Sequence, residues 1–446
     1  MKKKILSLFL ISSALNTFAD VNLYGRVAVG VENDDVNNST APTGGSIQDM
    51  GSYFGLRGID PVYGSTAAIW QVEQYLDITS GQIYYVTSGG GLITPYPGSS
   101  GISNGIVRQQ INTLASSESY LGLQGDWGRV RLGNLSNYQR SDMGAIDTFN
   151  YNNGVDGLGL WSRAARILPT AFRYDSPTWG GFNFSGIYSF TSNSQFGLNP
   201  ISPGTSQSGG FNGNYSGAIY GLGLTWSSDE FAIKLGTMVN QQVGLYDSSN
   251  GTTINPSSNI TNNVQYSNAH ISRLELSYND PDGAIIGLGL QVADGWGWAG
   301  WANSGGSFNN FVYNPALPTP AGLNTAQYQT QEMGASFGWH IGPWTPKIAY
   351  VYGNNLMYNS DLWGIITGTG NQIANSGYQQ AVAELDWNIN PKTIVFINYG
   401  QIWYGSTLSN VSYSYSVGTT ICQTPTFSGG AYNNQSSTAI GFTHTF

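Results

Sequence analysis

The sequence predicts an all-β fold, a transmembrane antiparallel β-barrel of about 16 strands. The first observation is that stretches with alternating apolar and polar residues recur along the whole chain. The second is that short and long connections alternate between these stretches. The third is the composition, in which 60 glycines, 28 tyrosines and 13 tryptophans accompany only 9% charged residues. Soluble domains usually carry about 25% charged residues, so this composition favours a wall that faces lipid.

The N-terminus predicts a secretory signal peptide. Lys2, Lys3 and Lys4 precede an apolar run over residues 5–15, and Thr17-Phe18-Ala19 resembles an A-x-A cleavage site. The apolar run is too short for a membrane-spanning helix, which needs about 20 residues. We therefore expect residues 1–19 to be removed and residues 20–446 to form a single barrel domain.

The charge of the expected mature chain argues against nucleic-acid binding. Removing the three N-terminal lysines from the 16 basic residues leaves 13, against 25 acidic residues, which gives a net charge of −12. The chain contains one cysteine, Cys422, and one cysteine cannot form a disulfide within the chain. No motif for a metal or another cofactor is recognised, so we expect none.

Alternation with a period of two predicts strands, because successive side chains of a strand point to opposite faces. In residues 21–32 the odd positions are apolar or glycine, whereas Asn22, Arg26 and Glu32 occupy even positions. The pattern predicts sixteen strands, over residues 21–33, 51–60, 65–77, 117–125, 128–134, 170–176, 181–191, 216–227, 230–239, 267–279, 283–293, 330–341, 345–353, 378–388, 392–402 and 436–446.

The connections between these strands differ in length in a regular order. Seven are tight and rich in turn residues, such as residues 126–127 and 280–282, and eight are long, such as 78–116 and 135–169. Short turns at one end and long loops at the other are typical of outer-membrane barrels. A soluble all-β protein would not need this asymmetry, and a propeller or β-helix would show a fixed repeat, which we do not find.

Several segments resemble a known family. They are residues 20–25 (DVNLYG), 52–58 (SYFGLRG), 68–74 (AIWQVEQ), 120–133 (YLGLQGDWGRVRLG), 172–177 (FRYDSP) with 180–182 (GGF), and 441–446 (GFTHTF). Together they resemble the trimeric general porins of Gram-negative bacteria, of the type common in β-proteobacteria. The match is dense over residues 20–190 and returns at the C-terminus.

The resemblance implies a homotrimer in the lipids of the outer membrane. Each subunit would be a water-filled channel for passive diffusion of ions and small hydrophilic solutes, and not an enzyme. The terminal Phe446 resembles the C-terminal signal that the outer-membrane barrel assembly machinery recognises.

The resemblance also implies that residues 135–169 form the third extracellular loop, which folds into the lumen and narrows it. This loop contains Asp142, Asp147, Asp156, Arg163 and Arg166. Acids on the loop that face basic residues on the wall would set a transverse field, and fixed charges of this kind decide which ions pass.

Further charges are expected on the inner wall. Successive side chains of a strand alternate between lipid and lumen, and a charge at the lipid midplane costs about 2–4 kcal/mol. If Val130, Leu132, Phe172 and Tyr174 face lipid, the residues Arg129, Arg131, Arg173 and Asp175 face the lumen. The same reasoning turns six more side chains inward, namely Arg26, Arg57, Glu73, Lys234, Arg273 and Lys347. Instead of lining the narrowest point, any of these charges could hydrate the inner wall or pair with a residue on a neighbouring strand.

The chain departs from the family at several positions that are basic in the family. Tyr53, Asn134, Thr443 and Thr445 occupy them here. These departures remove positive charge from the expected lumen, and they favour a small preference for cations.

Two other functions remain open from the sequence. Long loops rich in Gly, Asn and Ser would also suit a surface adhesion or structural barrel, with a closed lumen. Scattered His, Ser and Asp residues would also suit an outer-membrane hydrolase, but His270, His340 and His444 lie in no triad motif.

One segment resembles a nucleotide-binding motif by letter alone. Residues 295–300 match G-x-G-x-x-G, but no helix is predicted after them.

Overall fold

A computed structural model describes the chain over residues 21–36, 45–79, 114–152, 155–162, 164, 167–190, 218–247, 264–294, 328–358, 360–406 and 434–446. The first half of the barrel contains β1 (Asn22–Val36), β2 (Gly45–Asp49), β3 (Ser52–Tyr63), β4 (Thr66–Leu76), β5 (Ser119–Gly125), β6 (Gly128–Ser136), β7 (Ile167–Asp175), β8 (Phe182–Ser189) and β9 (Ile219–Ser227). The second half contains β10 (Phe231–Asp247), β11 (Val264–Asn279), β12 (Ala284–Asp294), β13 (Tyr328–Trp339), β14 (Trp344–Gly353), β15 (Met357–Tyr358), β16 (Tyr378–Asn390), β17 (Thr393–Tyr404) and β18 (Gln435–Thr445).

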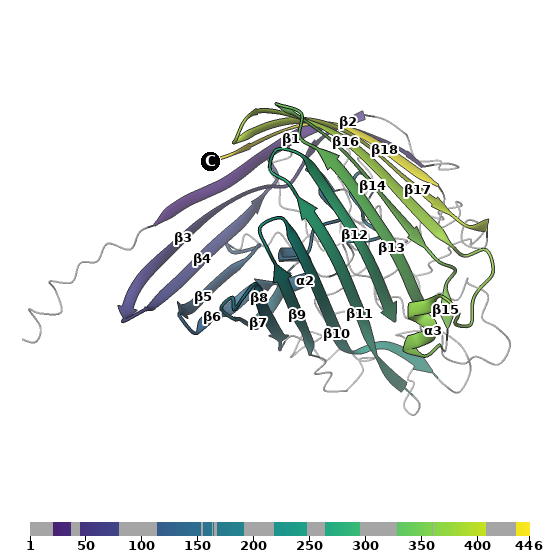
Figure 1. The fold of residues 1–446 in the computed structure, drawn as a ribbon, viewed down its shortest axis with the longest axis horizontal. Coiled ribbons are helices and arrows are strands. Elements are labelled where there is room, and N and C mark those ends of the chain that lie inside the picture. Colours follow the sequence, from purple (N-terminus) through teal and green to yellow (C-terminus); the bar gives the residue numbers. More distant parts are fainter. Residues whose placement is uncertain are drawn as a thin grey trace, which may run out of the picture.

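These strands form one antiparallel sheet that closes on itself (Figure 1). Neighbours in sequence are neighbours in the sheet, and β1 pairs with β18, so that Val29 lies opposite Phe442. A closed sheet has no free edge, and all its backbone groups can pair within the wall. The architecture is therefore that of a membrane-spanning barrel.

The wall consists of sixteen strands, as the sequence predicts. β2 and β3 both pair with β1 and are separated only by Met50 and Gly51. Gly51 has a φ of 96°, in the left-handed region that favours glycine, so the two are one wall strand with an irregularity. β15 has two residues and pairs with β13 within the connection from β14 to β16. Each of the sixteen predicted ranges overlaps one wall strand, whereas β10 and β11 extend further than predicted.

Two short helices, α2 (Tyr138–Ser141) and α3 (Leu362–Thr367), lie in connections between strands. Asn137 caps α2, because its side-chain oxygen accepts a hydrogen bond from the Arg140 amide at 3.2 Å. In the described part of the chain, no helix is both long and apolar enough to cross a membrane.

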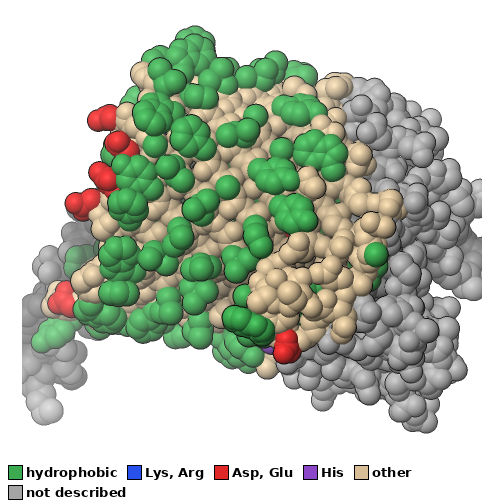
Figure 2. Space-filling view, turned by 45° about the vertical axis from the view of Figure 1, so that its right-hand side comes forward, with side chains coloured by type: hydrophobic (Ala, Val, Ile, Leu, Met, Phe, Trp, Pro, Cys, Tyr) green, Lys and Arg blue, Asp and Glu red, His purple; other side chains and the backbone are tan. Residues whose placement is uncertain are grey.

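The two faces of the wall differ in polarity. Along β14 the exposed positions include Ile348 and Tyr350, and the buried positions between them include Lys347 and Ala349. Figure 2 shows apolar side chains spread over the outer surface, with acidic side chains towards its edge. Trp344 stacks on Trp387 of a neighbouring strand at a ring distance of 5.6 Å, which is typical of an aromatic girdle.

The buried apolar residues lie inside the barrel rather than between two layers. One cluster joins Leu135 and Ala164 to Ile187 and Met238 on the inner wall. A second joins Ile146 and the other loop residues Leu158 and Trp161 to wall residues, namely Ala349, Val351 and Val382. The segment after β6 is therefore packed against the inner wall, and it positions the candidate site.

Candidate functional site

The connection between β6 and β7 follows the inner wall through most of its circumference. The Tyr138 hydroxyl donates to the Leu224 carbonyl of β9 at 2.8 Å. Further along the loop, the Ala145 amide donates to Glu275 of β11 at 2.9 Å. Near its far end, Asp156 accepts a hydrogen bond from Ser437 of β18 at 2.6 Å. These contacts place the loop inside the barrel.

Wall glycines make room for this loop. A Cβ at Gly289 of β12 would lie 2.6 Å from the Trp161 ring, and a Cβ at Gly400 of β17 would collide with the Val155 carbonyl. Trp161 is completely buried against this wall. Burial of one large apolar side chain contributes about 1.5–3 kcal/mol, so the packing holds the loop firmly.

The contacts of the loop with the wall are confined to one part of the barrel. Within the described residues, the hydrogen bonds of residues 138–162 to the wall reach β7, β9–β11, β13, β14, β16–β18 and β1, but not β3, β4 or β5. The loop thus covers one side of the lumen, and the inner face of β3–β5 stays uncovered by these contacts.

Five predicted site residues form one ion-pair network at the base of the loop. Asp175 of β7 contacts Arg129 at 3.2 Å, Arg131 at 2.8 Å and Arg173 at 2.8 Å. Arg173 also pairs with Asp142 of the loop at 2.7 Å.

The register explains why these arginines come together. Arg131 lies directly opposite Arg173 on the neighbouring strand, and Arg129 lies opposite Asp175. Two like charges in such positions repel, and the carboxylate between them offsets the repulsion. Arg131 has a further acidic partner, Glu118, at 2.8 Å. Three arginines are therefore balanced by three carboxylates.

A second network lies on β14 and β16. The Lys347 ammonium contacts Glu384 at 2.6 Å and Asp386 at 2.8 Å, and it donates to the Thr148 carbonyl of the loop at 2.9 Å. Asn150 of the loop donates to Glu384 at 3.0 Å. Lys347 was expected on the inner wall, but its acidic partners were not identified. Glu384 and Asp386 are two residues apart, so the side-chain period could have placed both on the inner face.

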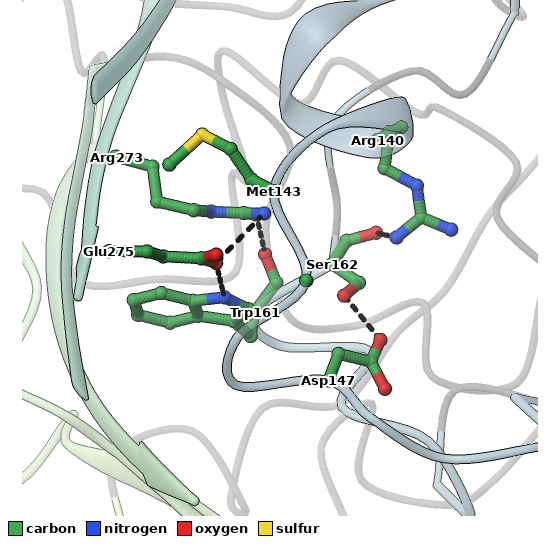
Figure 3. A pocket seen from close by; sticks show the side chains of 8 residues that line it. Arg140, Met143, Asp147, Trp161, Ser162, Arg273 and Glu275 are labelled. Atoms are coloured by element: carbon green, nitrogen blue, oxygen red, sulfur yellow. Dashed lines mark hydrogen bonds and ion pairs between the residues drawn. The ribbon is translucent and has the colours of Figure 1, made fainter. Parts of the chain in front are cut away.

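A third group surrounds Trp161 (Figure 3). The Arg273 guanidinium lies over the Trp161 ring at 5.0 Å and donates to the Trp161 carbonyl. Glu275 accepts from the indole nitrogen of Trp161 at 3.0 Å. Beside this group is a pocket of about 130 Å³, which Arg140 and Asp147 also line. No periodic signal marks Trp161, because it lies in a loop.

The remaining predicted residues lie in different surroundings. Arg26 donates to the Asn150 carbonyl at 2.7 Å, and Lys234 donates to the Asp142 carbonyl. Glu73 is buried and accepts from the Tyr24 hydroxyl at 2.9 Å, and the Arg57 guanidinium lies over the Tyr24 ring.

Two of the predicted loop acids differ in exposure. Asp147 is half-buried and accepts from Asn152 at 3.0 Å, whereas Asp156 is completely buried. Burial raises the pKa of Asp156 to about 8, and the hydrogen bond from Ser437 lowers it less than burial raises it. Arg163 and Arg166 lie outside the described residues.

The C-terminal residue joins the barrel seam. The Phe446 amide donates to the Gly25 carbonyl at 3.1 Å, and the aromatic ring covers Gly25 so closely that a Cβ there would lie 2.6 Å from it.

Comparisons with known proteins agree on one class. The sequence matches the family model described as Gram-negative porin over residues 7–407. It is 22% identical to major outer membrane protein P.IA of Neisseria meningitidis serogroup B (strain ATCC BAA-335 / MC58), over 89% of this chain and 93% of that protein. It is 23% identical to major outer membrane protein P.IB of Neisseria meningitidis serogroup B, over 91% of this chain and 94% of that protein.

Solved structures share the fold. An anion-selective porin from Comamonas acidovorans has a TM-score of 0.59 at 16% identity, over 96% of this chain and all of that chain. The in-vitro folded OmpT of Vibrio cholerae in its trimer form has a TM-score of 0.53 at 13% identity, over 96% of this chain and 99% of that chain.

Proposed function

Because the chain belongs to the Gram-negative porin family, we propose that the loop between β6 and β7 sets the narrowest point of its channel. The protein is a β-barrel of the outer membrane through which ions and small hydrophilic solutes diffuse passively. The proposal rests on one observation: in the described part of the chain, the loop packs along one side of the lumen, and its hydrogen bonds to the wall do not reach β3–β5.

Charged side chains on the wall and on the loop support the proposal of a transverse field. Arg57 is exposed on β3, and the side chain of Arg129 on β6 is 39% exposed. On the loop, the Asp142 side chain is 39% exposed and Asp147 is half-buried. The exposed arginines of the wall and the aspartates of the loop would orient a polar solute as it passes, and fixed charges at a constriction select among ions.

We propose a small preference for cations. The inner wall has eight basic residues, Arg26, Arg57, Arg129, Arg131, Arg173, Lys234, Arg273 and Lys347. It has nine acidic residues, Glu32, Asp34, Glu73, Glu118, Asp175, Glu275, Glu332, Glu384 and Asp386. The wall thus has one more acidic than basic residue, and the described part of the loop adds three aspartates, Asp142, Asp147 and Asp156, against Arg140. Two more loop arginines, Arg163 and Arg166, lie outside the described residues. Because Asp156 is completely buried, the preference rests on the more exposed Asp142 and Asp147.

The remaining proposals follow from the family. Residues 1–19 would be removed as a signal peptide, and Phe446 would direct the chain to the barrel assembly machinery. The protein would assemble as a homotrimer and would act as a channel without enzyme activity. The trimer form of the Vibrio cholerae OmpT structure supports the assembly through the shared fold.

Single-channel conductance in a planar bilayer under a KCl gradient tests the proposal. We expect large, stable steps in groups of three and a reversal potential that favours potassium. Steps that favour chloride would overturn the cation preference alone. Silent bilayers from correctly folded protein would overturn the open channel and favour a closed adhesion barrel.

A further inference from the structure

Four tyrosines lie on the inner face of β1 and β3–β5, and the hydrogen bonds of the described loop residues do not reach β3, β4 or β5. Tyr53 of β3 lies opposite both Arg26 of β1 and Tyr75 of β4. Arg26 points into the lumen, because it donates to the loop between β6 and β7, here called the inner loop. Residues directly opposite in a sheet point to the same face, so both tyrosines face the lumen. Tyr24 of β1 faces the lumen through its bond to Glu73, and Tyr120 of β5 lies opposite Gln71. All four rings are half-buried.

The Tyr24 ring is held in a fixed position. It covers Gly55, where any Cβ would collide with the ring. Its hydroxyl donates to the buried Glu73 at 2.9 Å, and its edge meets Tyr53 with ring centres 6.3 Å apart and planes at 64°. Rings that are already ordered lose little entropy when a further ring joins them.

Arg57 stands beside these rings with its hydrogen-bond donors open. Its guanidinium lies 4.8 Å from the centre of the Tyr24 ring, and the side chain is exposed. Within the described residues it makes no ion pair or hydrogen bond, whereas Arg131 and Arg173 are paired with carboxylates. A guanidinium offers five donors in a planar fork that matches a carboxylate. Its open side can therefore accept an anion from the passage.

We propose that Arg57, Tyr24 and Tyr53 form a binding subsite for aromatic carboxylates on the channel wall. The carboxylate pairs with the Arg57 fork, and the solute ring packs on the tyrosines at the 4.5–7 Å spacing usual for aromatic pairs. Tyr75 lies opposite Tyr53, and Tyr120 lies in the row of Arg57 and Gln71, so both continue the aromatic surface across β4 and β5. The inference rests on the proposed function, because solutes must reach this face through the open channel.

The two halves of the subsite together define the solute. An inorganic anion would use only the guanidinium, and a neutral sugar would use only the ring faces. A saturated ring acid would have the right charge and size but would not form the edge-to-face contacts. Binding must remain weak, since a solute that passes through a channel has to leave each site again.

The test is current blockage of single channels in KCl by benzoate, with cyclohexanecarboxylate and benzyl alcohol as matched solutes. We expect benzoate to cause brief blockages at least fivefold more often than either control at equal concentration. Arg57→Gln should reduce the benzoate blockages about fivefold, and Tyr53→Leu should reduce them without affecting cyclohexanecarboxylate. Tyr350→Leu, on the outer wall, should leave them unchanged.

Each result has a defined meaning. Open channels in which benzoate blocks no more often than cyclohexanecarboxylate would overturn the subsite and leave the proposed channel intact. Silent bilayers would overturn both. Should Arg57→Gln fail to fold, Arg57→Lys keeps the charge but loses the planar fork. Unchanged blockages in that variant would overturn the role of the fork.

Discussion

The carboxylate of Asp175 lies 2.8 Å from the guanidinium of Arg131, which itself lies directly opposite Arg173 on the neighbouring strand. One acid thus separates two arginines that would otherwise repel each other in a buried part of the wall. Asp175 also holds Arg129, so that a single carboxylate connects three positive charges at the base of the inner loop. Both the stability of this region and its net charge depend on that acid.

We predict that Asp175→Asn destabilises the barrel and shifts its selectivity towards anions. Removing one partner of a buried ion pair costs about 3–5 kcal/mol, because the remaining charges are left uncompensated. The midpoint of urea unfolding in detergent should fall, and the reversal potential should move towards that of chloride. Asp126→Asn, at an exposed turn, is the control and should change neither. An unchanged midpoint would show that the network contributes nothing to stability.

We predict that Asp142→Asn and Asp147→Asn each weaken the preference for cations. Both side chains are on the loop and are partly exposed. In Asp147→Asn the amide oxygen of the new side chain can still accept the hydrogen bond from Asn152. The ratio of potassium to chloride permeability should fall about twofold in each variant, since each loses one fixed negative charge. Reversal potentials in a KCl gradient measure this ratio. A rise in the ratio would contradict the assignment of the loop as the acidic side of the passage.

We predict that the inner loop is anchored more firmly in acid than in alkali. Burial raises the pKa of Asp156 to about 8 from an ordinary value of 3.8, so the folded protein holds this proton over a range in which the unfolded chain has lost it. The contribution to stability is therefore fully present below about pH 4, and it declines as the pH rises towards 8. The urea midpoint should fall between pH 5 and pH 9.

The variant Asp156→Asn isolates this effect. It keeps the shape and the hydrogen bond from Ser437 but cannot ionise. Its urea midpoint should fall less than that of the unmodified protein between pH 5 and pH 9. Asp147→Asn, at a half-buried position, should retain the full decrease. Equal decreases in the unmodified protein and in Asp156→Asn would remove Asp156 as the cause.

The fold was predictable because the side-chain period of a strand is a local property. Arg129 and Arg131 could be assigned to the inner face from their apolar neighbours alone. Which residues oppose each other is not local, since the pairing of Lys347 with Glu384 depends on the register of β14 and β16. The burial of Trp161 was not predictable either, because a loop has no period from which to infer its direction.

We predict that Gly289→Ala displaces the inner loop. A Cβ at this wall position would lie 2.6 Å from the Trp161 ring, which is completely buried and cannot move aside without moving the loop. Overpacking of this kind costs about 1–3 kcal/mol. The loop should shift towards the open side of the passage, so that single-channel conductance decreases by roughly a third or more, an estimate that follows from the width of one methyl group in a narrow gap. Gly186→Ala is the matched control, because a Cβ there would meet its nearest neighbour, Leu222, at an ordinary 3.6 Å. Conductance equal to that of the control would mean that the loop absorbs the methyl group without moving, and that Trp161 does not set the width of the passage.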